Sequence, residues 1–246
     1  MGEIIAVLSG KGGTGKTSVC AGLAVALAQS GLKVLCIDCD VGLRNLDLSL
    51  GIADSGALSF WDVASGNYSL DHAAVHPDLP TLHFLTAPME LPGEKEISES
   101  FAAMLRTARN TFDYLFLDAA AGVDAGFRLT ARNADRHLIV TGAAPAAVRD
   151  ATRVGELLEL MGKPTPRLLV NRVDKAMFSS LHMTIDDVMD TTGLPLLGIV
   201  PEDSNITLAA ACGTPLALYR KRSPASAAFR RIAHRIQGIP EPITFR

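Results

Sequence analysis

The sequence predicts an α/β protein with a single domain: a doubly wound, mostly parallel sheet with helices on both faces. Short apolar runs alternate with segments of helical periodicity along the whole chain. This alternation is typical of right-handed crossovers, which place helices over both faces of a parallel sheet. Hydrophobic residues make up 48% of the chain but aromatic residues only 5%. The core must therefore consist mainly of Ala, Val, Leu and Ile, which suits strands buried on both faces.

The expected strands are short apolar runs bounded by polar or glycine-containing segments. In chain order they are Ile4–Leu8, Lys33–Ile37, Leu82–Thr86, Tyr114–Leu117, His137–Val140, Arg167–Val170 and Leu196–Val200.

The expected helices show apolar residues at i, i+3, i+4 and i+7. Gly15–Gln29 is an Ala-rich helix after the first strand, and Ala225–Gln237 is the last helix. Two sets carry the periodicity most clearly: Val154, Leu157, Leu158 and Met161, then Phe229, Ile232, Ala233 and Ile236. The Pro- and Gly-containing segment Ala87–Ser98 is expected to be a connector. No linker divides the chain, so we expect one domain over 1–246, with 239–246 as a short tail.

Charge and cysteine usage limit the classes of function. The net charge of −3 argues against a surface coated for nucleic acid, no run of apolar residues is long enough to span a membrane, and the four cysteines show no disulfide framework. We expect a cytoplasmic protein, at most peripheral to the inner face of the cell membrane. From 220 to 246 seven basic residues face one acidic residue, a net of +6, which leaves −9 for the rest of the chain. This segment is either a solvated face or an electrostatic contact zone.

A glycine-rich loop follows the first strand. Ile4–Leu8 leads into Gly10-Lys11-Gly12-Gly13-Thr14-Gly15-Lys16-Thr17, and a helix begins near Lys16. This is the strand–loop–helix context of a P-loop, in which backbone N–H groups and the helix N-terminus bind phosphates. Lys16 is expected to neutralise the β- and γ-phosphates of ATP, and the Thr17 hydroxyl to ligate Mg²⁺. The expected nucleotide-binding residues of this loop are Gly10, Lys11, Gly12, Gly13, Thr14, Gly15, Lys16, Thr17 and Ser18.

Three aspartates follow strands whose carboxyl ends should lie near this loop. Lys33–Ile37 is followed by Asp38 and Asp40, and Tyr114–Leu117 by Asp118. We expect Asp38 and Asp118 to be Mg²⁺ ligands, directly or through water. Asp40 is expected to orient the attacking water, because phosphoryl transfer depends on positioning and electrostatics. The alternative for each is turn or capping chemistry, which is common for Asp.

Cys36 and Cys39 have the spacing of a redox pair or half of a metal site. No second pair accompanies them, and they flank an aspartate at a strand end. We therefore interpret them as core residues. The six histidines are scattered and form no ligand pattern.

Lys11 is not needed by an ordinary P-loop. The pattern Lys-Gly-Gly-x-Gly-Lys-Thr resembles that of the deviant Walker A ATPases. The resemblance implies that Lys11 reaches the ATP of a partner subunit, so that nucleotide joins two subunits face to face. Lys11 and Lys16 would then both stabilise phosphate charge, with Asp40 as the third catalytic residue. The alternative is a solvated lysine on a loop.

The stretch from Asp38 to Leu48 is similar to the corresponding stretch of the MinD-like branch, whereas partition and nitrogenase-type relatives continue with different sequences. Val148-Arg149-Asp150 resembles the motif that opens an interface helix in that branch. The resemblance implies that Arg44, Asn45 and Asp150 contact partners: division-inhibitor and activator proteins. It also implies an ATP-dependent homodimer that acts as a hydrolysis-timed switch in division-site placement.

Two short motifs resemble the adenine side of these ATPases. They are Val170-Asn171-Arg172 and Gly198-Ile199-Val200-Pro201-Glu202-Asp203. The resemblance implies that Asn171, Arg172, Pro201 and Asp203 bind the base.

The chain departs from the MinD-like pattern at two places around the expected dimer. Ala120 stands where these relatives have proline, and Gly142-Ala143-Ala144 where they have Asn-Pro-Glu. Both changes are expected to loosen the ATP-bound dimer and to slow hydrolysis. They leave open a nucleotide-binding interaction module with little turnover.

The C-terminal segment differs as well. The amphipathic membrane-targeting tail of these relatives is not apparent after Gly238, so we expect weak or absent direct membrane contact. Two further classes of positioning ATPase stay open: a partition type that uses the basic segment on DNA, and a flagellar-number type. The sequence after Asp38 argues against the partition type, so no DNA binding is expected.

Overall fold

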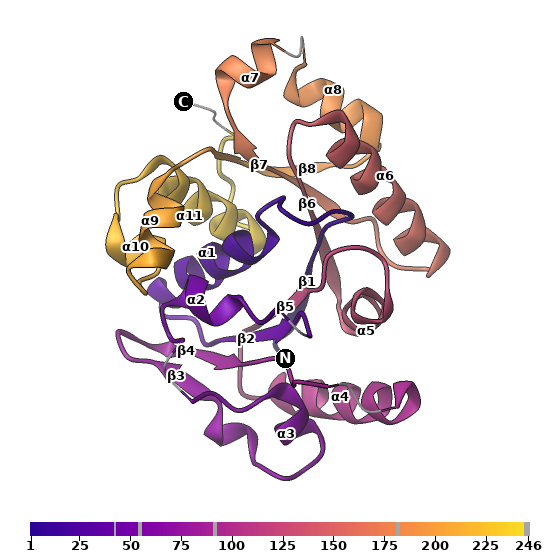
Figure 1. The fold of residues 1–246 in the computed structure, drawn as a ribbon, viewed down its shortest axis with the longest axis vertical. Helices are drawn as coiled ribbons and strands as arrows, with labels where there is room; N and C mark the ends of the chain where they lie inside the picture. Colours follow the sequence, from indigo (N-terminus) through magenta and orange to yellow (C-terminus); the bar gives the residue numbers. More distant parts are fainter. Residues whose placement is uncertain (42, 54–55, 91–92, 181–182, 244–246) are drawn as a thin grey trace.

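A mostly parallel sheet runs through the molecule (Figure 1). The computed structural model describes residues 1–41, 43–53, 56–90, 93–180 and 183–243. Within them the sheet has eight strands in the order β3-β4-β2-β5-β1-β6-β7-β8, and only β3 is antiparallel to its neighbour. The strands are β1 (Glu3–Leu8), β2 (Val34–Cys39), β3 (Ala74–His76), β4 (Leu79–Leu85), β5 (Tyr114–Ala119), β6 (Arg136–Thr141), β7 (Arg167–Val173) and β8 (Leu196–Pro201).

Helices cover both faces of the sheet. One core cluster joins the sheet to α1 (Lys16–Gln29), α2 (Leu46–Leu50), α9 (Asn205–Ala211), α10 (Leu216–Tyr219) and α11 (Pro224–Ile236). The other joins it to α3 (Phe60–Ala64), α4 (Glu94–Ala108), α5 (Ala125–Asn133), α6 (Pro145–Leu160), α7 (Lys175–Ser180) and α8 (Ile185–Thr192). A short 3₁₀ turn, Leu70–His72, precedes β3. The doubly wound prediction is confirmed.

Strand β1 shows why the sequence gives this arrangement. Its residues alternate between the two clusters: Ile5 and Val7 belong to one, and Ile4, Ala6 and Leu8 to the other. All are buried. Because successive side chains of a strand point to opposite faces, a fully apolar strand requires a helical layer on each side.

Close packing of α1 on α11 depends on a small residue. A Cβ at Gly22 would lie 2.4 Å from the Phe229 ring. The apolar side of α11, including Phe229 and Ile232, is buried in the core. The helix therefore has no large apolar face left to insert into a membrane. No helix among the described residues combines the length and hydropathy that crossing a bilayer requires.

All seven predicted strands are present, with bounds that differ by one to three residues. Strand β3 is not among the predicted strands, because a three-residue edge strand carries little sequence pattern. The prediction that Ala87–Ser98 is a connector was wrong in its second half, since α4 begins at Glu94. An acidic residue such as Glu96 favours a helix N-terminus because negative charge interacts with the partial positive charge there.

Cys36 and Cys39 are free and buried, as the core interpretation predicts. Cys36 belongs to one core cluster and Cys39 to the other. Their side chains lie on opposite faces of the sheet, so they cannot act as a pair.

Candidate nucleotide-binding site

The glycine loop lies where the central strands end. β1 pairs with β5 on one side and with β6 on the other, and β2 pairs with β5. The register places Asp38 of β2 opposite Asp118 of β5, and Val7 of β1 opposite Asp118. Two carboxylates from separate parts of the chain are thus brought to the base of the loop that connects β1 to α1. Ligands of open α/β sheets bind at this edge.

Two glycines of the loop are fixed by close neighbours. A Cβ at Gly10 would lie 2.6 Å from the carbonyl oxygen of Asp150 on α6. Gly15 has a φ of 82°, and a Cβ there would lie 2.3 Å from Nδ2 of Asn171. Since real Cβ atoms do not approach other atoms so closely, only glycine fits at either position. The loop is therefore clamped between α6 and the end of β7.

Lys16 forms a buried ion pair with Asp118. Its Nζ lies 2.7 Å from Oδ1 of Asp118, and the two side chains are 6% and 1% exposed. Burial alone would lower the pKa of Lys16, but the charge of Asp118 and its hydrogen bond outweigh burial, so the pKa is raised. The lysine is therefore fully charged at the base of the loop.

Asp38 is buried beside this pair and organises the segment after β2. One oxygen accepts the Asp40 N–H at 2.8 Å, and the other accepts the Leu46 N–H at the start of α2 at 3.1 Å. Burial and the negative charge of Asp118 raise the pKa of Asp38 to about 6. Burial also raises the pKa of Asp40, although Lys16 opposes this and Asp118 adds to it. A divalent cation would relieve the repulsion among these carboxylates.

A pocket of about 410 Å³ opens beside the loop, a size that suits a small ligand. Its lining comprises Lys11, Gly12, Gly13, Thr14, Gly142, Ala143, Ala144, Ala147, Arg172, Asp174 and Glu202. Near its base, the Thr14 hydroxyl and Oδ1 of Asn171 are buried without a hydrogen-bond partner among the described residues. Buried polar atoms are normally satisfied, so these two retain hydrogen-bonding capacity beneath the loop, although only Thr14 belongs to the pocket lining. Lysine charge, backbone N–H groups and carboxylates suitable for a cation together fit Mg²⁺ and a nucleotide.

Asn171 and Arg172, two of the residues predicted to bind adenine, lie in different surroundings. The Asn171 amide donates to the Thr14 carbonyl at 2.8 Å, so it supports the loop from below. Arg172 has a left-handed φ of 56°, and it donates to Glu202 at 2.9 Å and to the Gly13 carbonyl at 3.3 Å. The hydrogen bond to Glu202 raises the pKa of Arg172. This ion pair forms one wall of the pocket.

Pro201 and Asp203 do not line the pocket. Pro201, half-buried, ends β8. The Asp203 carboxylate accepts the Asn205 N–H at 3.0 Å and the Ala225 N–H at 3.2 Å, which joins this loop to α11. Burial tends to raise the pKa of Asp203, but hydrogen bonds from Asn205 and Ala225 lower it. The Asp203 carboxylate therefore connects the loop after β8 to the first turn of α11.

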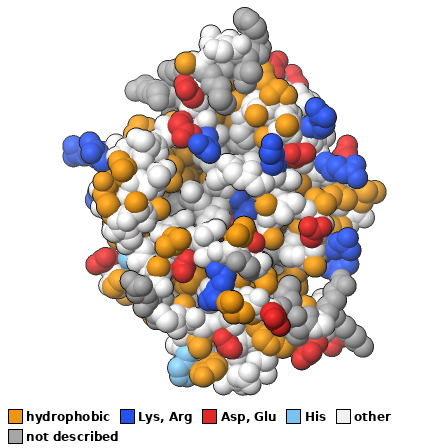
Figure 2. Space-filling model, in the orientation of Figure 1, with side chains coloured by type: hydrophobic (Ala, Val, Ile, Leu, Met, Phe, Trp, Pro, Cys, Tyr) orange, Lys and Arg blue, Asp and Glu red, His pale blue; other side chains and the backbone are white. Residues whose placement is uncertain are grey.

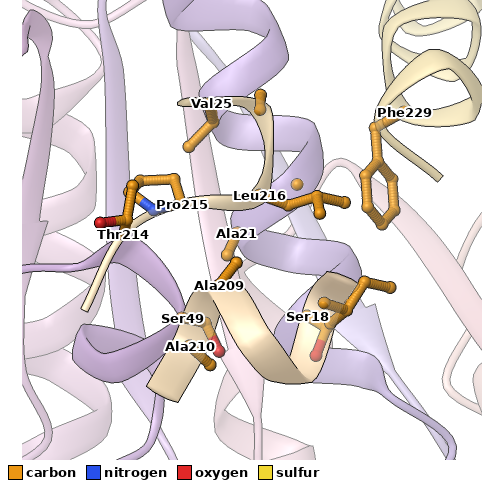
Figure 3. A pocket seen from close by; sticks show the side chains of 13 residues that line it. Ser18, Ala21, Val25, Ser49, Ala209, Ala210, Thr214, Pro215, Leu216 and Phe229 are labelled. Carbon is orange, nitrogen blue, oxygen red and sulfur yellow. The ribbon is translucent and has the colours of Figure 1, made fainter. Parts of the chain in front are cut away.

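Ser18 faces away from the pocket. Its side chain lines a small apolar cavity of about 30 Å³ between α1 and the α9–α10 segment, with Ala209 and Leu216 (Figure 3). Only the backbone of Ser18 can take part in phosphate binding. Thr17, the next residue towards the loop, is half-buried at the start of α1.

The predicted interface residues are distributed over the same edge. Lys11 is exposed at the rim of the pocket. Arg44 is half-buried and donates to the Thr86 hydroxyl at 3.1 Å, and Asn45 is exposed at the start of α2. Asp150, half-buried, packs against Gly10.

Ala120 and Ala144 are the residues that depart from the MinD-like pattern. They follow β5 and β6, the two strands that flank β1. Ala144 is exposed, occupies the N-cap position of α6 and lines the pocket. Ala120 follows β5, and a Cβ at Gly126 would lie 3.2 Å from the Ala120 methyl group.

Glu202 and Asp174 line the pocket but are not among the predicted site residues. Glu202 lies between Pro201 and Asp203, which were both predicted. Its negative charge, opposite to that of Arg172, was the sequence signal that could have indicated it. Asp174 follows the carboxyl end of β7, which was the same signal that singled out Asp118.

The strand, clamped glycine loop, buried lysine and paired carboxylates define a P-loop nucleotide-binding protein. Residues 5–216 match the CobQ/CobB/MinD/ParA nucleotide binding domain. The septum site-determining protein MinD of Synechocystis sp. is 39% identical over 244 residues, covering 98% of this chain and 92% of that protein. The MinD protein of Bacillus subtilis is 36% identical, covering 99% and 92%.

The comparison with solved structures points to the same family. MinD in the MinC:MinD cell division protein complex of Aquifex aeolicus matches with a TM-score of 0.90 and 31% identity, covering 99% of this chain and 98% of that chain. MinD of Pyrococcus horikoshii complexed with Mg-ADP matches with a TM-score of 0.83 and 28% identity, covering 96% of each chain. The chain belongs to the MinD/ParA family of P-loop ATPases. It is a MinD-like ATPase of cell-division site placement that uses ATP and Mg²⁺.

Proposed function

We propose that ATP assembles two copies of this chain face to face and that hydrolysis, timed by a partner protein, separates them. The observation that carries this proposal is the contrast between two lysines of one loop. Lys16 is buried and paired with Asp118, whereas Lys11 is exposed at the pocket rim and takes part in none of the ion pairs formed by the described residues. A lysine held outside its own site on a rigid loop is available to a nucleotide bound by another subunit.

Within each site the residues have separate tasks. Thr17, Asp38 and Asp118 hold Mg²⁺, which neutralises phosphate charge when bound. Lys16 and Lys11 stabilise the phosphate oxygens, and Asp40 orients the attacking water. Asp40 suits this task because it is half-buried and its N–H is anchored to Asp38 at 2.8 Å. Water attacks the γ-phosphorus, and ADP and inorganic phosphate leave.

The base binds on the Arg172 side of the pocket. Oδ1 of Asn171, buried and without a partner among the described residues, is available to accept a hydrogen bond from an amino group. Arg172 lines that side of the pocket, whereas Pro201 lies outside the lining, at the end of β8. Of the predicted adenine residues, Asp203 contributes by holding its loop in place.

The partner is a division-inhibitor protein, and an activator sets the moment of hydrolysis. Support comes from the MinC:MinD complex of Aquifex aeolicus, to which this fold is similar over 99% of its length. Arg44, Asn45 and Asp150 are the candidate contacts. Direct contact with a membrane is weak, because the apolar face of α11 is in the core, and DNA is not a partner.

A second candidate function is a nucleotide-binding interaction module with little turnover. Only Ala120 and Ala144 favour it, because they stand where MinD-like relatives have proline and glutamate. Phosphate release in the presence of Mg²⁺ distinguishes the two. We expect measurable release that Asp40→Ala abolishes and that Asp186→Ala, an exposed aspartate on α8, leaves unchanged. Equal background rates for the wild type and Asp40→Ala would favour the module.

A further inference from the structure

A groove with basic walls and an apolar floor lies between α5 and α6. Its volume is about 350 Å³, in the range of ligand sites. Its lining comprises Val123, Phe127, Arg128, Arg132, Arg153, Leu157 and Met161. Figure 2 shows basic side chains over this edge of the molecule, with hydrophobic surface between them. The groove is separate from the nucleotide pocket, with which it shares no lining residue.

The arginines of the groove have no acidic partners in the part of the chain that the structure describes. Arg128 and Arg132 lie on α5 and Arg153 on α6, and all three are exposed. No carboxylate lies within ion-pair distance of them among the described residues. The lining itself contains no acidic residue. Three unpaired positive charges around one groove, in a chain with a net charge of −3, create a local field that attracts an anionic partner.

The floor of the groove limits which anionic partner fits. Leu157 and Met161 are half-buried and Val123 is 38% exposed, so apolar surface is available between the basic walls. Phe127 is only 2% exposed, so its ring cannot stack on a nucleic-acid base. A recessed floor is also poorly reached by a flat membrane surface. A groove lined by residues of two helices accommodates a third helix, whose apolar face meets the floor while its acidic residues meet the arginines.

The two ends of the groove are structurally defined. Lys163 donates to the Arg132 carbonyl at 2.6 Å and so joins the end of α5 to the turn after α6. At the other end Val123 belongs to the segment that leaves Asp118, and the neighbouring Gly122 N–H donates to the Ser9 carbonyl at 3.2 Å, beside the glycine loop. The groove is therefore a fixed surface that touches the nucleotide site through one short segment.

From these observations we infer that the α5–α6 groove docks an acidic amphipathic helix of another protein. Arg128, Arg132 and Arg153 pair with its carboxylates, and Val123, Leu157 and Met161 receive its apolar side chains. This surface is additional to the candidate contacts Arg44, Asn45 and Asp150. Asp150 packs on the glycine loop, whereas Arg153, on the same helix, lines the groove.

The test is fluorescence anisotropy with the full chain and a synthetic labelled helical peptide of about 15 residues, with Leu at i, i+3, i+4 and i+7 and Glu at most other positions. We expect saturable binding at about 0.15 M salt. Charge reversal in Arg128→Glu/Arg153→Glu should weaken it roughly tenfold or more, since charge-assisted contacts are lost and repulsion replaces them. Two exposed arginines outside the groove provide the matched control: Arg106 on the neighbouring α4 and Arg167 on β7. Arg106→Glu alone and the double variant Arg106→Glu/Arg167→Glu should each change the affinity by less than about twofold.

A second probe in which every Leu is replaced by Ser tests the apolar floor, and hydrogen exchange with the first probe bound tests the location. We expect the Ser probe to bind much more weakly and protection to appear in α5 and α6. Equal losses in the groove and control variants, equal binding of the two probes, or protection elsewhere would overturn the proposal. Tighter, arginine-dependent binding of phosphatidylglycerol vesicles or of duplex DNA would do so as well.

Discussion

Lys16 and Asp118, 102 residues apart in the chain, form a buried ion pair of 2.7 Å at the base of the glycine loop. The pair joins the first turn of α1 to the end of β5. It fixes the charge that faces the phosphates and also connects that charge to a candidate Mg²⁺ ligand. Several consequences of this geometry are open to measurement.

Breaking the pair from one side should cost much more stability than breaking an exposed pair. Asp118→Asn leaves a charged lysine in a buried site, and we expect a loss of about 3 kcal/mol or more in the free energy of unfolding without nucleotide. Glu202→Gln breaks the exposed pair with Arg172 and should cost about 1 kcal/mol or less. Urea unfolding provides both values. Similar losses for the two variants would show that the buried pair has no special role.

The affinity for Mg²⁺ and ADP should depend on the protonation of Asp38. The pKa of Asp38 is raised to about 6, so the carboxyl is protonated and a poor ligand below that pH. Because the pKa of Asp38 is raised by folding, protonation of this carboxyl stabilises the metal-free fold at low pH. This stabilisation is lost as the pH rises through about 6. We expect calorimetry to show tighter Mg²⁺-dependent ADP binding at pH 7.5 than at pH 5.5.

Asp38→Asn is the control for this pH dependence, because ADP itself titrates equally in both experiments. The variant should bind more weakly at pH 7.5 and show a smaller difference between the two pH values. A pH dependence that is identical in the wild type and the variant would exclude Asp38 as its source.

Gly10 should tolerate no side chain. In Gly10→Ala the new Cβ would meet the Asp150 carbonyl oxygen, which lies 2.6 Å away, so the loop or α6 must shift. We expect loss of nucleotide binding and a lower melting temperature. Gly93→Ala, where a Cβ meets none of the described residues within 4 Å and φ is −53°, should change neither. Normal nucleotide affinity in Gly10→Ala would mean that the loop is not clamped as described.

Restoring glutamate at position 144 should strengthen the ATP-bound dimer. Ala144 is exposed at the pocket, at the position where the MinD-like pattern has a glutamate. A new charge-assisted hydrogen bond is worth about 1.5–3 kcal/mol when it forms, which corresponds to roughly ten- to a hundredfold in affinity. Analytical ultracentrifugation of Ala144→Glu with a non-hydrolysable ATP analogue gives the dimer affinity. An unchanged or weaker dimer would indicate that the glutamate has no contact to make here.

The site was predictable from the sequence to the extent that it depends on local pattern and strand ends. The glycine loop and the aspartates after β2 and β5 are such features, since parallel strands bring their carboxyl ends together. Tertiary contacts carry no comparable signal. The Lys16–Asp118 pair, the position of Asn171 beneath the loop and the left-handed backbone of Arg172 depend on side-chain packing across the sheet edge. The role of Asp203 as a tie to α11 also follows from packing alone.

The most direct test of the proposed function is light scattering of the wild type and Lys11→Ala over a range of concentrations with Mg²⁺ and a non-hydrolysable ATP analogue. We predict that the wild type doubles its mass only with nucleotide and at high concentration. Lys11→Ala should bind the nucleotide yet remain monomeric, because Lys11 is exposed and makes no ion pair within the described part of its own chain. A wild type that stays monomeric at every concentration, or a Lys11→Ala variant that dimerises equally well, would contradict the proposal.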